Sequence, residues 1–271
     1  MSDAIRLKKH LIRFFIYTLF LVVAFFSLII SVQVVAEPNT ILMNDSRWPP
    51  FFFAGDQLAP PGAAKEILEI CFDETGYPVE FTFFPINLLH KYLEIGRLDL
   101  NVYSFKPQRE AILYYGKEAL YRTSYRPFVR WDSPIQIKSL RDFDNLVIGH
   151  LEGVTYSERY LAYLRKKQAQ GKVLTVRSNV YGLTMLIKKR IDILVEADST
   201  IFWFAKQLGV TDKIKMLDFD IRTADYFLTV SKKSRKIKDP QKFLAKIDEC
   251  IRGLKKDGRY AEIMKKYGLE Y

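Results

Sequence analysis

The chain has 271 residues, 49% of them hydrophobic, and is long enough for one large domain or two lobes of ordinary size with a sizeable core. Its 42 Lys and Arg against 31 Asp and Glu give a formal net charge of +11. Two cysteines exclude a disulfide-dense scaffold, and because His10, His90 and His150 form no cluster with them, we expect no structural metal.

The first 36 residues carry a targeting pattern. Four basic side chains precede an apolar run over residues 14–30, and Val34 and Ala36 occupy the two small-residue positions before a signal-peptidase cut. We predict a signal peptide that is cleaved after Ala36, which places the mature protein in the periplasm. The apolar run is nearly long enough to span a bilayer, so an uncleaved anchor stays an alternative.

Export changes how the basic charge is interpreted. An exported protein does not reach nucleic acid, and the charges are scattered without an aromatic-interleaved stripe, so we expect no nucleic-acid partner. A solvated basic surface that attracts anionic ligands, or an anionic membrane surface, is the better interpretation. We expect a monomer that contacts the membrane only through its N-terminal segment, if that segment is retained.

The mature chain begins with alternating strand and helix patterns. The expected elements are a strand over 40–44, a loop over 45–50, a helix over 63–73 ending at Gly76, a strand over 79–83, a helix over 86–95 ending at Gly96, and a strand over 98–102. This βαβαβ order with short connections favours a mostly parallel sheet.

The middle of the chain repeats this order in new sequence. We expect a strand over 145–149, a helix over 156–167, a strand over 173–176, a helix over 180–189 and a strand over 191–195. Extended segments over 125–130 and 223–230 link the two units, and helices from Pro240 onward return to the first. The prediction is an α/β protein of two βαβαβ lobes with a two-segment hinge, lobe 1 over 37–125 and 224–271 and lobe 2 over 126–223.

Short motifs follow one another along the mature chain. They are Trp48-Pro49-Pro50-Phe51, Gly96-Arg97-Leu98-Asp99, Lys106-Pro107-Gln108-Arg109-Glu110, the run over 148–155, Arg190-Ile191-Asp192 and the run over 254–260. In type, order and spacing they resemble family 3 extracellular solute-binding proteins, the polar amino-acid receptors of ABC importers. The resemblance implies a periplasmic-binding-protein-like type II fold. It also implies that a small polar ligand, an amino acid or related carboxylate, is captured for an ABC permease.

The resemblance also implies a site for a carboxylate. Arg109 stands where family members place a carboxylate-binding arginine, whose planar fork donates two parallel hydrogen bonds. Ser104 matches a ligand-contacting hydroxyl. Thr155 occupies the matching position in lobe 2, at the start of a predicted helix whose free N–H groups bind the same anion. The alternatives are a surface role for Arg109 and a helix-capping role for Thr155.

The other candidates concern the rest of the ligand. Trp48 matches the aromatic residue that covers a ligand side chain, and Tyr103 is a candidate for the opposite wall, with ordinary core packing as the alternative. The acid that binds the α-ammonium group in many such receptors falls at Ala197. Glu196 and Asp198 flank that position, although strand alternation points neighbours to opposite faces. The ligand therefore lacks an amino group or is held differently.

Two other functions compete with ligand binding. Cyclohexadienyl and arogenate dehydratases resemble these receptors, and Glu196 or Asp198 is the candidate general acid for such an enzyme. A ligand-sensing module is the second alternative. The sequence has no nucleophile elbow and no cofactor fingerprint, so we expect a binding protein without catalytic residues or cofactors.

Cys71 and Cys250 both fall on predicted helices. The favoured interpretation is two buried, unpaired thiols that act as small apolar residues. A single bridge between the first helix and the C-terminal helix is the alternative, because an oxidising compartment permits it.

Overall fold

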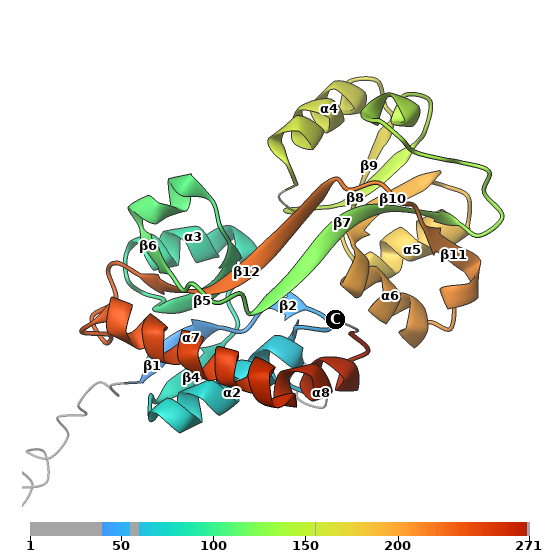
Figure 1. Ribbon diagram of the computed structural model, residues 1–271. Coiled ribbons are helices and arrows are strands. Elements are labelled where there is room, and N and C mark those ends of the chain that lie inside the picture. Colours follow the sequence, from blue (N-terminus) through green and yellow to red (C-terminus); the bar gives the residue numbers. More distant parts are fainter. Residues whose placement is uncertain (1–39, 55–59, 155, 270–271) are drawn as a thin grey trace, which may run out of the picture. The chain divides into compact units, whose positions relative to one another are not determined.

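The computed structural model describes residues 40–54, 60–154 and 156–269. The predicted signal peptide lies outside these residues. The largest sheet has the order β4-β1-β5-β12-β7-β10-β8-β9 (Figure 1). Its strands are β1 (Ile41–Asn44), β4 (Val79–Thr82), β5 (Leu100–Ser104), β7 (Tyr121–Arg130), β8 (Ile148–Leu151), β9 (Val173–Val176), β10 (Ile193–Ala197) and β12 (Arg222–Ser231). Two short strands, β6 (Leu113–Tyr115) and β11 (Ile214–Met216), pair with β12 and β7.

The sheet consists of two halves with the same arrangement. In the first half β1 pairs in parallel with β4 and β5, and in the second half β8 pairs in parallel with β9 and β10. The first half, with its helices, is called lobe 1 below, and the second half is called lobe 2. The helices of lobe 1 are α2 (Ala63–Thr75), α3 (Ile86–Glu94), α7 (Pro240–Asp257) and α8 (Arg259–Lys266). Those of lobe 2 are α4 (Glu158–Gln168), α5 (Asn179–Ile187) and α6 (Asp198–Gln207).

The strand and helix predictions for both βαβαβ units are confirmed to within a few residues. In α2 the apolar residues Ile67, Leu68 and Cys71 are fully buried, and the helix ends where Gly76 adopts a left-handed φ of 72°. Among the α-helices that the structure describes, only α6 has no counterpart among the expected helices, and the short strands β6 and β11 were not expected either. The sequence of α6 mixes buried apolar residues with aromatic and charged ones, and this hides the helical period.

Strands β5 and β10 begin two residues later than predicted, and for the same reason. The carboxylate of Asp99 accepts a hydrogen bond from the backbone N–H of Leu42 at 2.9 Å. The carboxylate of Asp192 accepts a hydrogen bond from the backbone N–H of Val147 at 2.8 Å. Each aspartate therefore belongs to the turn before its strand, where it satisfies an amide at the start of the neighbouring strand. The repeated Arg-hydrophobic-Asp motif has this structural role in both lobes.

Two long strands connect the lobes. Strands β7 and β12 pair with each other in antiparallel register, with Arg222 opposite Tyr125 and Tyr226 opposite Tyr121. Beyond this pairing β12 joins β5 and β7 joins β10, so each strand continues from one half-sheet into the other. They lie where the two linking segments were predicted. The lobe boundaries and the hinge motion stay predictions.

The turn after β1 contains more structure than the predicted loop. The dipeptides β2 (Arg47–Trp48) and β3 (Phe52–Phe53) form a small antiparallel hairpin around the cis peptide bond between Pro49 and Pro50. The hairpin buries Phe51 and Phe52 in the core of lobe 1. This packing fixes the position of the neighbouring Trp48.

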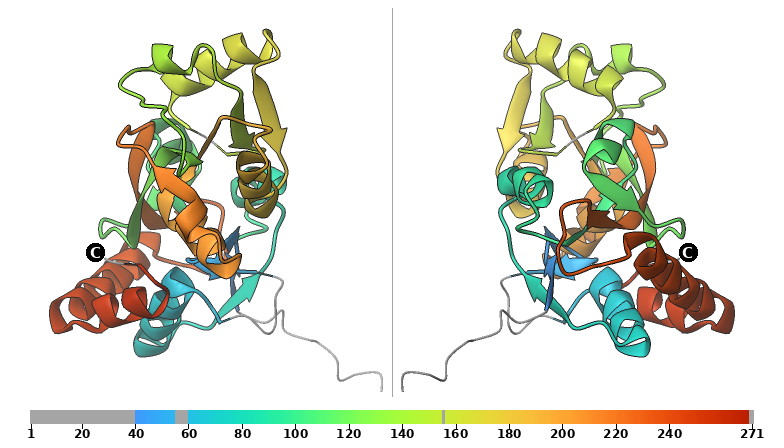
Figure 2. Two further views of the ribbon diagram at one scale, coloured as in Figure 1. Left: turned by 90° about the vertical axis from the view of Figure 1, so that its right-hand side faces the viewer. Right: turned by 90° about the vertical axis from the view of Figure 1, so that its left-hand side faces the viewer.

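The C-terminal helices return to lobe 1, as predicted. Helices α2, α7 and α8 pack together at one end of the described unit, and α4 lies at the opposite end (Figures 1 and 2). Cys71 of α2 and Cys250 of α7 form a disulfide with a Cα–Cα distance of 5.6 Å. The favoured interpretation of two unpaired thiols is therefore wrong. It failed because sequence does not show which faces of two distant helices meet.

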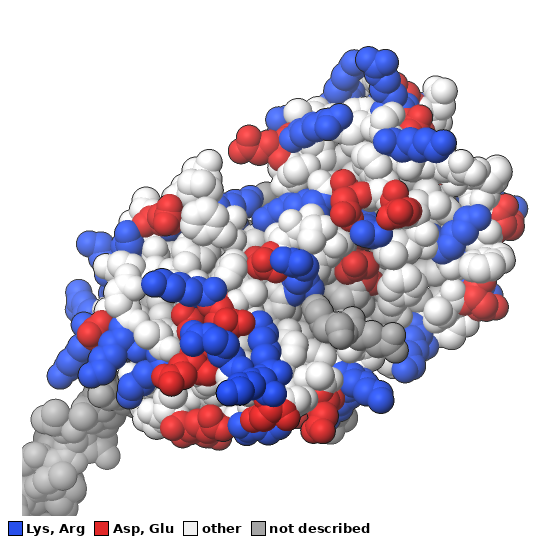
Figure 3. All heavy atoms as spheres, in the orientation of Figure 1, with Lys and Arg blue, Asp and Glu red and all other residues white. Residues whose placement is uncertain are grey.

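The surface carries charges of both signs. In the face shown in Figure 3, acidic side chains lie among the more numerous basic ones. Ion pairs at the surface include Arg122 with Asp225 and Lys255 with Glu118. Over residues 40–54, 60–154 and 156–269, no helix is both long and apolar enough to cross a membrane.

Candidate functional site

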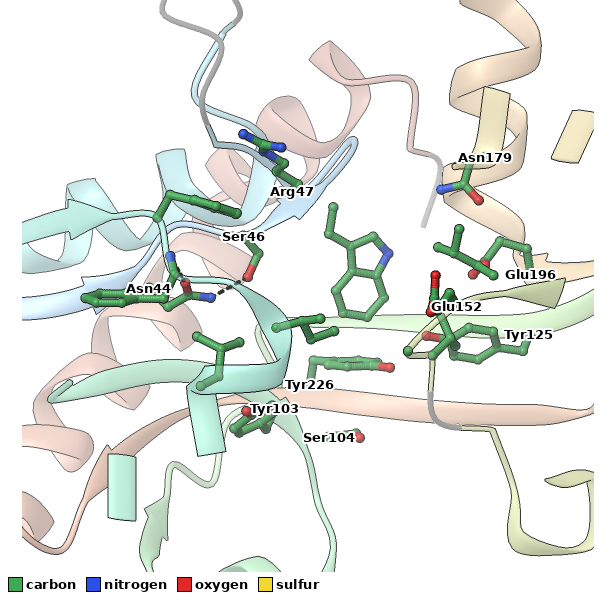
Figure 4. A pocket seen from close by; sticks show the side chains of 18 of the residues that line it. Asn44, Ser46, Arg47, Tyr103, Ser104, Tyr125, Glu152, Asn179, Glu196 and Tyr226 are labelled. Carbon is green, nitrogen blue, oxygen red and sulfur yellow. Dashed lines mark hydrogen bonds between the residues drawn. The ribbon is translucent and has the colours of Figure 1, made fainter. Parts of the chain in front are cut away.

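A cavity of about 350 Å³ lies between the two lobes. This volume is in the range of sites for small molecules. The lining residues come from both lobes: Asn44, Ser46, Arg47, Trp48, Phe83, Phe84, Ile86, Leu89, Tyr103, Ser104, Arg109, Arg222 and Tyr226, with Tyr125, Leu151, Glu152, Gly153, Val154, Asn179 and Glu196. Figure 4 shows many of these side chains around the cavity. Five of the seven predicted site residues line it, namely Trp48, Tyr103, Ser104, Arg109 and Glu196.

The wall in lobe 1 is built around Ser104, the last residue of β5. After this strand a short 3₁₀ helix (Pro107–Ala111) begins with a proline at its first position and turns the chain back. Arg109 in this turn donates a hydrogen bond from Nη1 to the carbonyl of Ser104 at 3.0 Å. Its guanidinium carbon lies 4.1 Å from the centroid of the Tyr103 ring. This cation–π contact holds the arginine at the cavity.

A second arginine reaches the same serine and was not among the predicted residues. Arg222 is the first residue of β12, and its Nη2 donates to Oγ of Ser104 at 2.6 Å. The two guanidinium groups thus approach one residue from different segments of the chain. A weak sequence signal existed, because Arg222 stands one residue before the predicted return crossing.

Trp48 forms an aromatic wall that is tied to lobe 2. Its ring meets that of Tyr226 edge to face, with 4.8 Å between centroids. The indole Nε1 donates to Oγ1 of Thr200 at 3.0 Å, and this hydroxyl donates to the carbonyl of Pro49 at 2.8 Å. The Thr200 hydroxyl of α6 therefore connects the hairpin of lobe 1 to lobe 2.

The wall in lobe 2 offers hydrogen-bond acceptors. Glu196 is 2% exposed, and its Oε1 accepts from the backbone N–H of Ala197 at 2.8 Å. Its Oε2 has no partner among the described residues, and burial raises the pKa of this carboxyl to about 7. Oδ1 of Asn179 is also buried without a described partner. Figure 4 shows both side chains extending from lobe 2 toward the cavity.

Two predicted site residues are not part of this arrangement. Asp198 does not line the cavity, because it begins α6, and its Oδ1 accepts from Oγ1 of Thr123 at 3.0 Å and from the backbone N–H of Ser199 at 2.7 Å. It ties α6 to the connecting strand β7. Thr155 lies outside the described residues. The helix that follows it begins at Glu158, two residues later than predicted, and Ser157 is its N-cap.

The chemistry of the site is that of binding polar groups. In the part of the chain that the structure describes, no three His, Cys, Asp or Glu side chains are grouped so that they could hold a metal ion. The cavity has hydrogen-bond donors in lobe 1 and an indole ring, and in lobe 2 it has acceptors without a partner among the described residues. Such a cavity complements a small ligand with an anionic and a cationic end.

Solved structures share this fold. The sensor domain of a histidine kinase, described as similar to periplasmic binding proteins, is 20% identical with a TM-score of 0.68, covering 86% of this chain and 98% of that one. A mutant of ArgBP from T. maritima is 17% identical with a TM-score of 0.66, covering 86% and 96%. A substrate-binding protein of an ABC uptake transporter from Streptococcus pneumoniae, with bound histidine, is 20% identical with a TM-score of 0.66, covering 84% and 92%.

At these identities the likeness shows the fold, so the predicted periplasmic-binding-protein-like fold is confirmed. The sequence matches none of the curated proteins. Residues 41–270 match the family described as bacterial extracellular solute-binding proteins, family 3, which confirms the resemblance that the motifs indicated.

Proposed function

The chain belongs to the bacterial extracellular solute-binding proteins of family 3, and from this we propose that it captures a free amino acid in the cavity between its lobes and delivers it to an ABC importer. The observation that carries the proposal is that donors line one wall of the cavity, while the other wall has acceptors for which the described residues provide no partner. A free amino acid presents a carboxylate and an ammonium group, and each must be matched when it leaves water.

The carboxylate is assigned to Arg109. Its guanidinium donates to the Ser104 carbonyl and is hydrogen-bonded to the Tyr115 side chain, and no carboxylate among the described residues forms an ion pair with it. The remaining donors suit a bidentate bond to a ligand carboxylate. Thr155 stays a candidate for binding the same carboxylate, because it occupies the matching position in the motif over residues 148–155.

The ammonium group is assigned to Glu196 and Asn179. Both have a buried oxygen acceptor without a described partner, and an ammonium group supplies three donors. This pair would bind the ammonium group in place of the acidic side chain that is absent at Ala197. The longer side chain of Glu196 reaches the cavity from the end of β10, while Ala197 is fully buried and lines no part of it.

Two further observations support a periplasmic location. The family comprises extracellular proteins, and disulfides such as Cys71–Cys250 persist mainly in oxidising compartments outside the cytoplasm. Export by cleavage after Ala36 is the route that we propose. The likeness to a histidine kinase sensor domain keeps a sensing role as an alternative to transport, and neighbouring genes for a permease and an ATPase would favour transport.

Binding is tested with a panel of the L-amino acids. We expect at least one of them to raise the melting temperature, because a ligand that binds only the folded state stabilises it. Replacing Arg109 by alanine is expected to weaken the binding of that amino acid by about 1.5–3 kcal/mol, the usual range for a hydrogen bond to a charged group. Calorimetry measures this difference in binding free energy. Arg141→Ala removes an exposed arginine outside the cavity and serves as the matched control. A panel without any stabilising amino acid would contradict the proposal.

Lobe closure is the second expected property. Only β7 and β12 of the described strands continue between the half-sheets, so a hinge near 124–127 and 223–227 would let the lobes approach each other. Small-angle scattering should give a smaller radius of gyration when the amino acid found in the panel is saturating. Superimposable curves with and without that amino acid would indicate a rigid cavity.

Glu196 also favours a second candidate function, the dehydratase-like enzyme. A carboxyl group that titrates near neutral pH inside a cavity suits a general acid. Consumption of prephenate by the purified protein would identify such an enzyme.

A further inference from the structure

The hydroxyl group of Thr200 bonds lobe 2 to the hairpin of lobe 1. Thr200 belongs to the first turn of α6, is 1% exposed and does not line the cavity. Its Oγ1 accepts a hydrogen bond from the indole Nε1 of Trp48 at 3.0 Å and donates one to the carbonyl of Pro49 at 2.8 Å. One buried hydroxyl therefore holds two successive residues of the other lobe.

The acceptor of the indole N–H determines how the Trp48 ring is oriented. An indole has one donor and no acceptor, so a single partner satisfies it. On the side of lobe 1 the ring makes edge contacts with Phe51 and Tyr226, with 6.0 and 4.8 Å between centroids. Such contacts hold the ring in place, whereas the hydrogen bond to Thr200 fixes the direction of its N–H. Trp48 lines the cavity, so this direction also fixes how its ring meets a ligand.

Thr200 itself is held firmly within lobe 2. Helix α6 begins at Asp198, whose Oδ1 accepts a hydrogen bond from the hydroxyl of Thr123 in β7 at 3.0 Å. One turn further along α6, the ring of Trp203 meets that of Phe53 in the hairpin, with 5.1 Å between centroids. Helix α6 thus contacts the hairpin at two points. A movement of α6 relative to the hairpin would therefore move the acceptor of the indole N–H.

Resting on the proposed function, we infer that Thr200 is a positioning residue for the ligand. It orients Trp48 against the bound amino acid and couples the orientation of this ring to the position of lobe 2, without touching the ligand itself. Loss of the hydroxyl leaves the indole N–H without its acceptor, which is costly unless the N–H turns toward water. The cavity beside the ring supplies that water, so the ring leaves the orientation in which it covers the ligand.

The emission of Trp48 tests its orientation without any ligand. Thr200→Val keeps the shape of the side chain and removes both hydrogen bonds, whereas Thr200→Ser keeps the hydroxyl. We expect Thr200→Val to shift the tryptophan emission to longer wavelength, because the indole becomes more exposed to water, and Thr200→Ser to leave it unchanged. In the Trp48→Phe background the shift should be absent. An unchanged spectrum of Thr200→Val, or an equal shift in the Trp48→Phe background, would contradict the inference.

The affinity for the amino acid found in the panel is the second measurement. Thr200→Val is expected to raise Kd about fivefold, as for the loss of one hydrogen bond, and Thr200→Ser to raise it less than about twofold. In the Trp48→Phe background the effect of Thr200→Val should fall to about twofold or less, because coupled residues do not contribute additively. Equal effects in both backgrounds would overturn the inference, because Thr200 would then act through Pro49 or through the fold.

Thr229→Val is the matched control. The Thr229 hydroxyl is also buried and donates to a backbone carbonyl, that of Asn101 at 2.7 Å, but both residues belong to lobe 1 and neither lines the cavity. We expect this variant to keep the emission and the affinity of the unaltered protein.

Two further outcomes are decisive. If Thr200→Val does not fold, as judged by circular dichroism, Trp48→Phe removes the same hydrogen bond from the indole side, and unchanged affinity in that variant would overturn the inference. Failure of all amino acids to bind would overturn the proposed function, while the emission spectra without ligand would still decide whether Thr200 orients Trp48.

Discussion

Reduction of the Cys71–Cys250 disulfide is expected to lower the free energy of unfolding by about 4–5 kcal/mol. The bridge joins residues 179 positions apart, so it restricts a large part of the unfolded chain. In the chain-entropy description, a longer closed loop gives a larger stabilisation. Urea unfolding of the oxidised and the reduced protein measures the difference without any change of sequence.

Reduction of the same disulfide is expected to leave the affinity for the ligand unchanged. Both cysteines belong to lobe 1, in α2 and α7, and neither lines the cavity. Calorimetry on the reduced protein, at a temperature where it stays folded, is the control. A decrease in the free energy of unfolding of less than about 1 kcal/mol on reduction would contradict the predicted destabilisation. It would mean that the unfolded chain gains little freedom when the disulfide is opened.

The second large effect concerns Glu196 and pH. Burial raises the pKa of Glu196 from its ordinary value of 4.5 to about 7 in the folded protein. The folded state therefore holds this proton more tightly than the unfolded state. The resulting stabilisation is fully present below about pH 4.5 and is lost as the pH rises through 7. Its size is on the order of 3 kcal/mol, from the difference between the two pKa values.

Replacing Glu196 by glutamine tests this directly. The glutamine stays neutral at every pH, so we expect the variant to gain stability relative to the unaltered protein between pH 5 and pH 8, as measured by urea unfolding without ligand. Glu152→Gln is the matched control, because Glu152 lines the same cavity but is exposed. Equal pH dependence in Glu196→Gln and the unaltered protein would mean that Glu196 is ionised in both states.

Ligand binding is expected to change the protonation of the Glu196 carboxyl group. An ammonium group next to Glu196 favours its carboxylate form, so binding near pH 6 is expected to release a proton. Calorimetry in buffers of different ionisation enthalpy measures this release, which should be lost in Glu196→Gln. Release of a proton would support the assignment of the ammonium group to Glu196.

The sequence alone determined the local elements of this protein. Helix α2 and strand β9 follow from short-range patterns, since apolar spacing and a terminal glycine act over a few residues. The approach of Arg109 to Ser104 belongs to the same class, because the two residues are five positions apart and joined by a turn that begins at Pro107. The motifs gave the family for the same reason, since each is a short segment.

Only the tertiary structure decided which distant segments meet. Arg222 reaches Ser104 across 118 positions, and the indole of Trp48 reaches Thr200 across 152. Sequence spacing contains no information on such pairs, because they depend on the order of strands in the sheet and on which helix faces are buried together. The same holds for the pairing of Cys71 with Cys250. It also holds for the cavity at Glu196, because whether its carboxyl has a partner depends on the packing of both lobes around it.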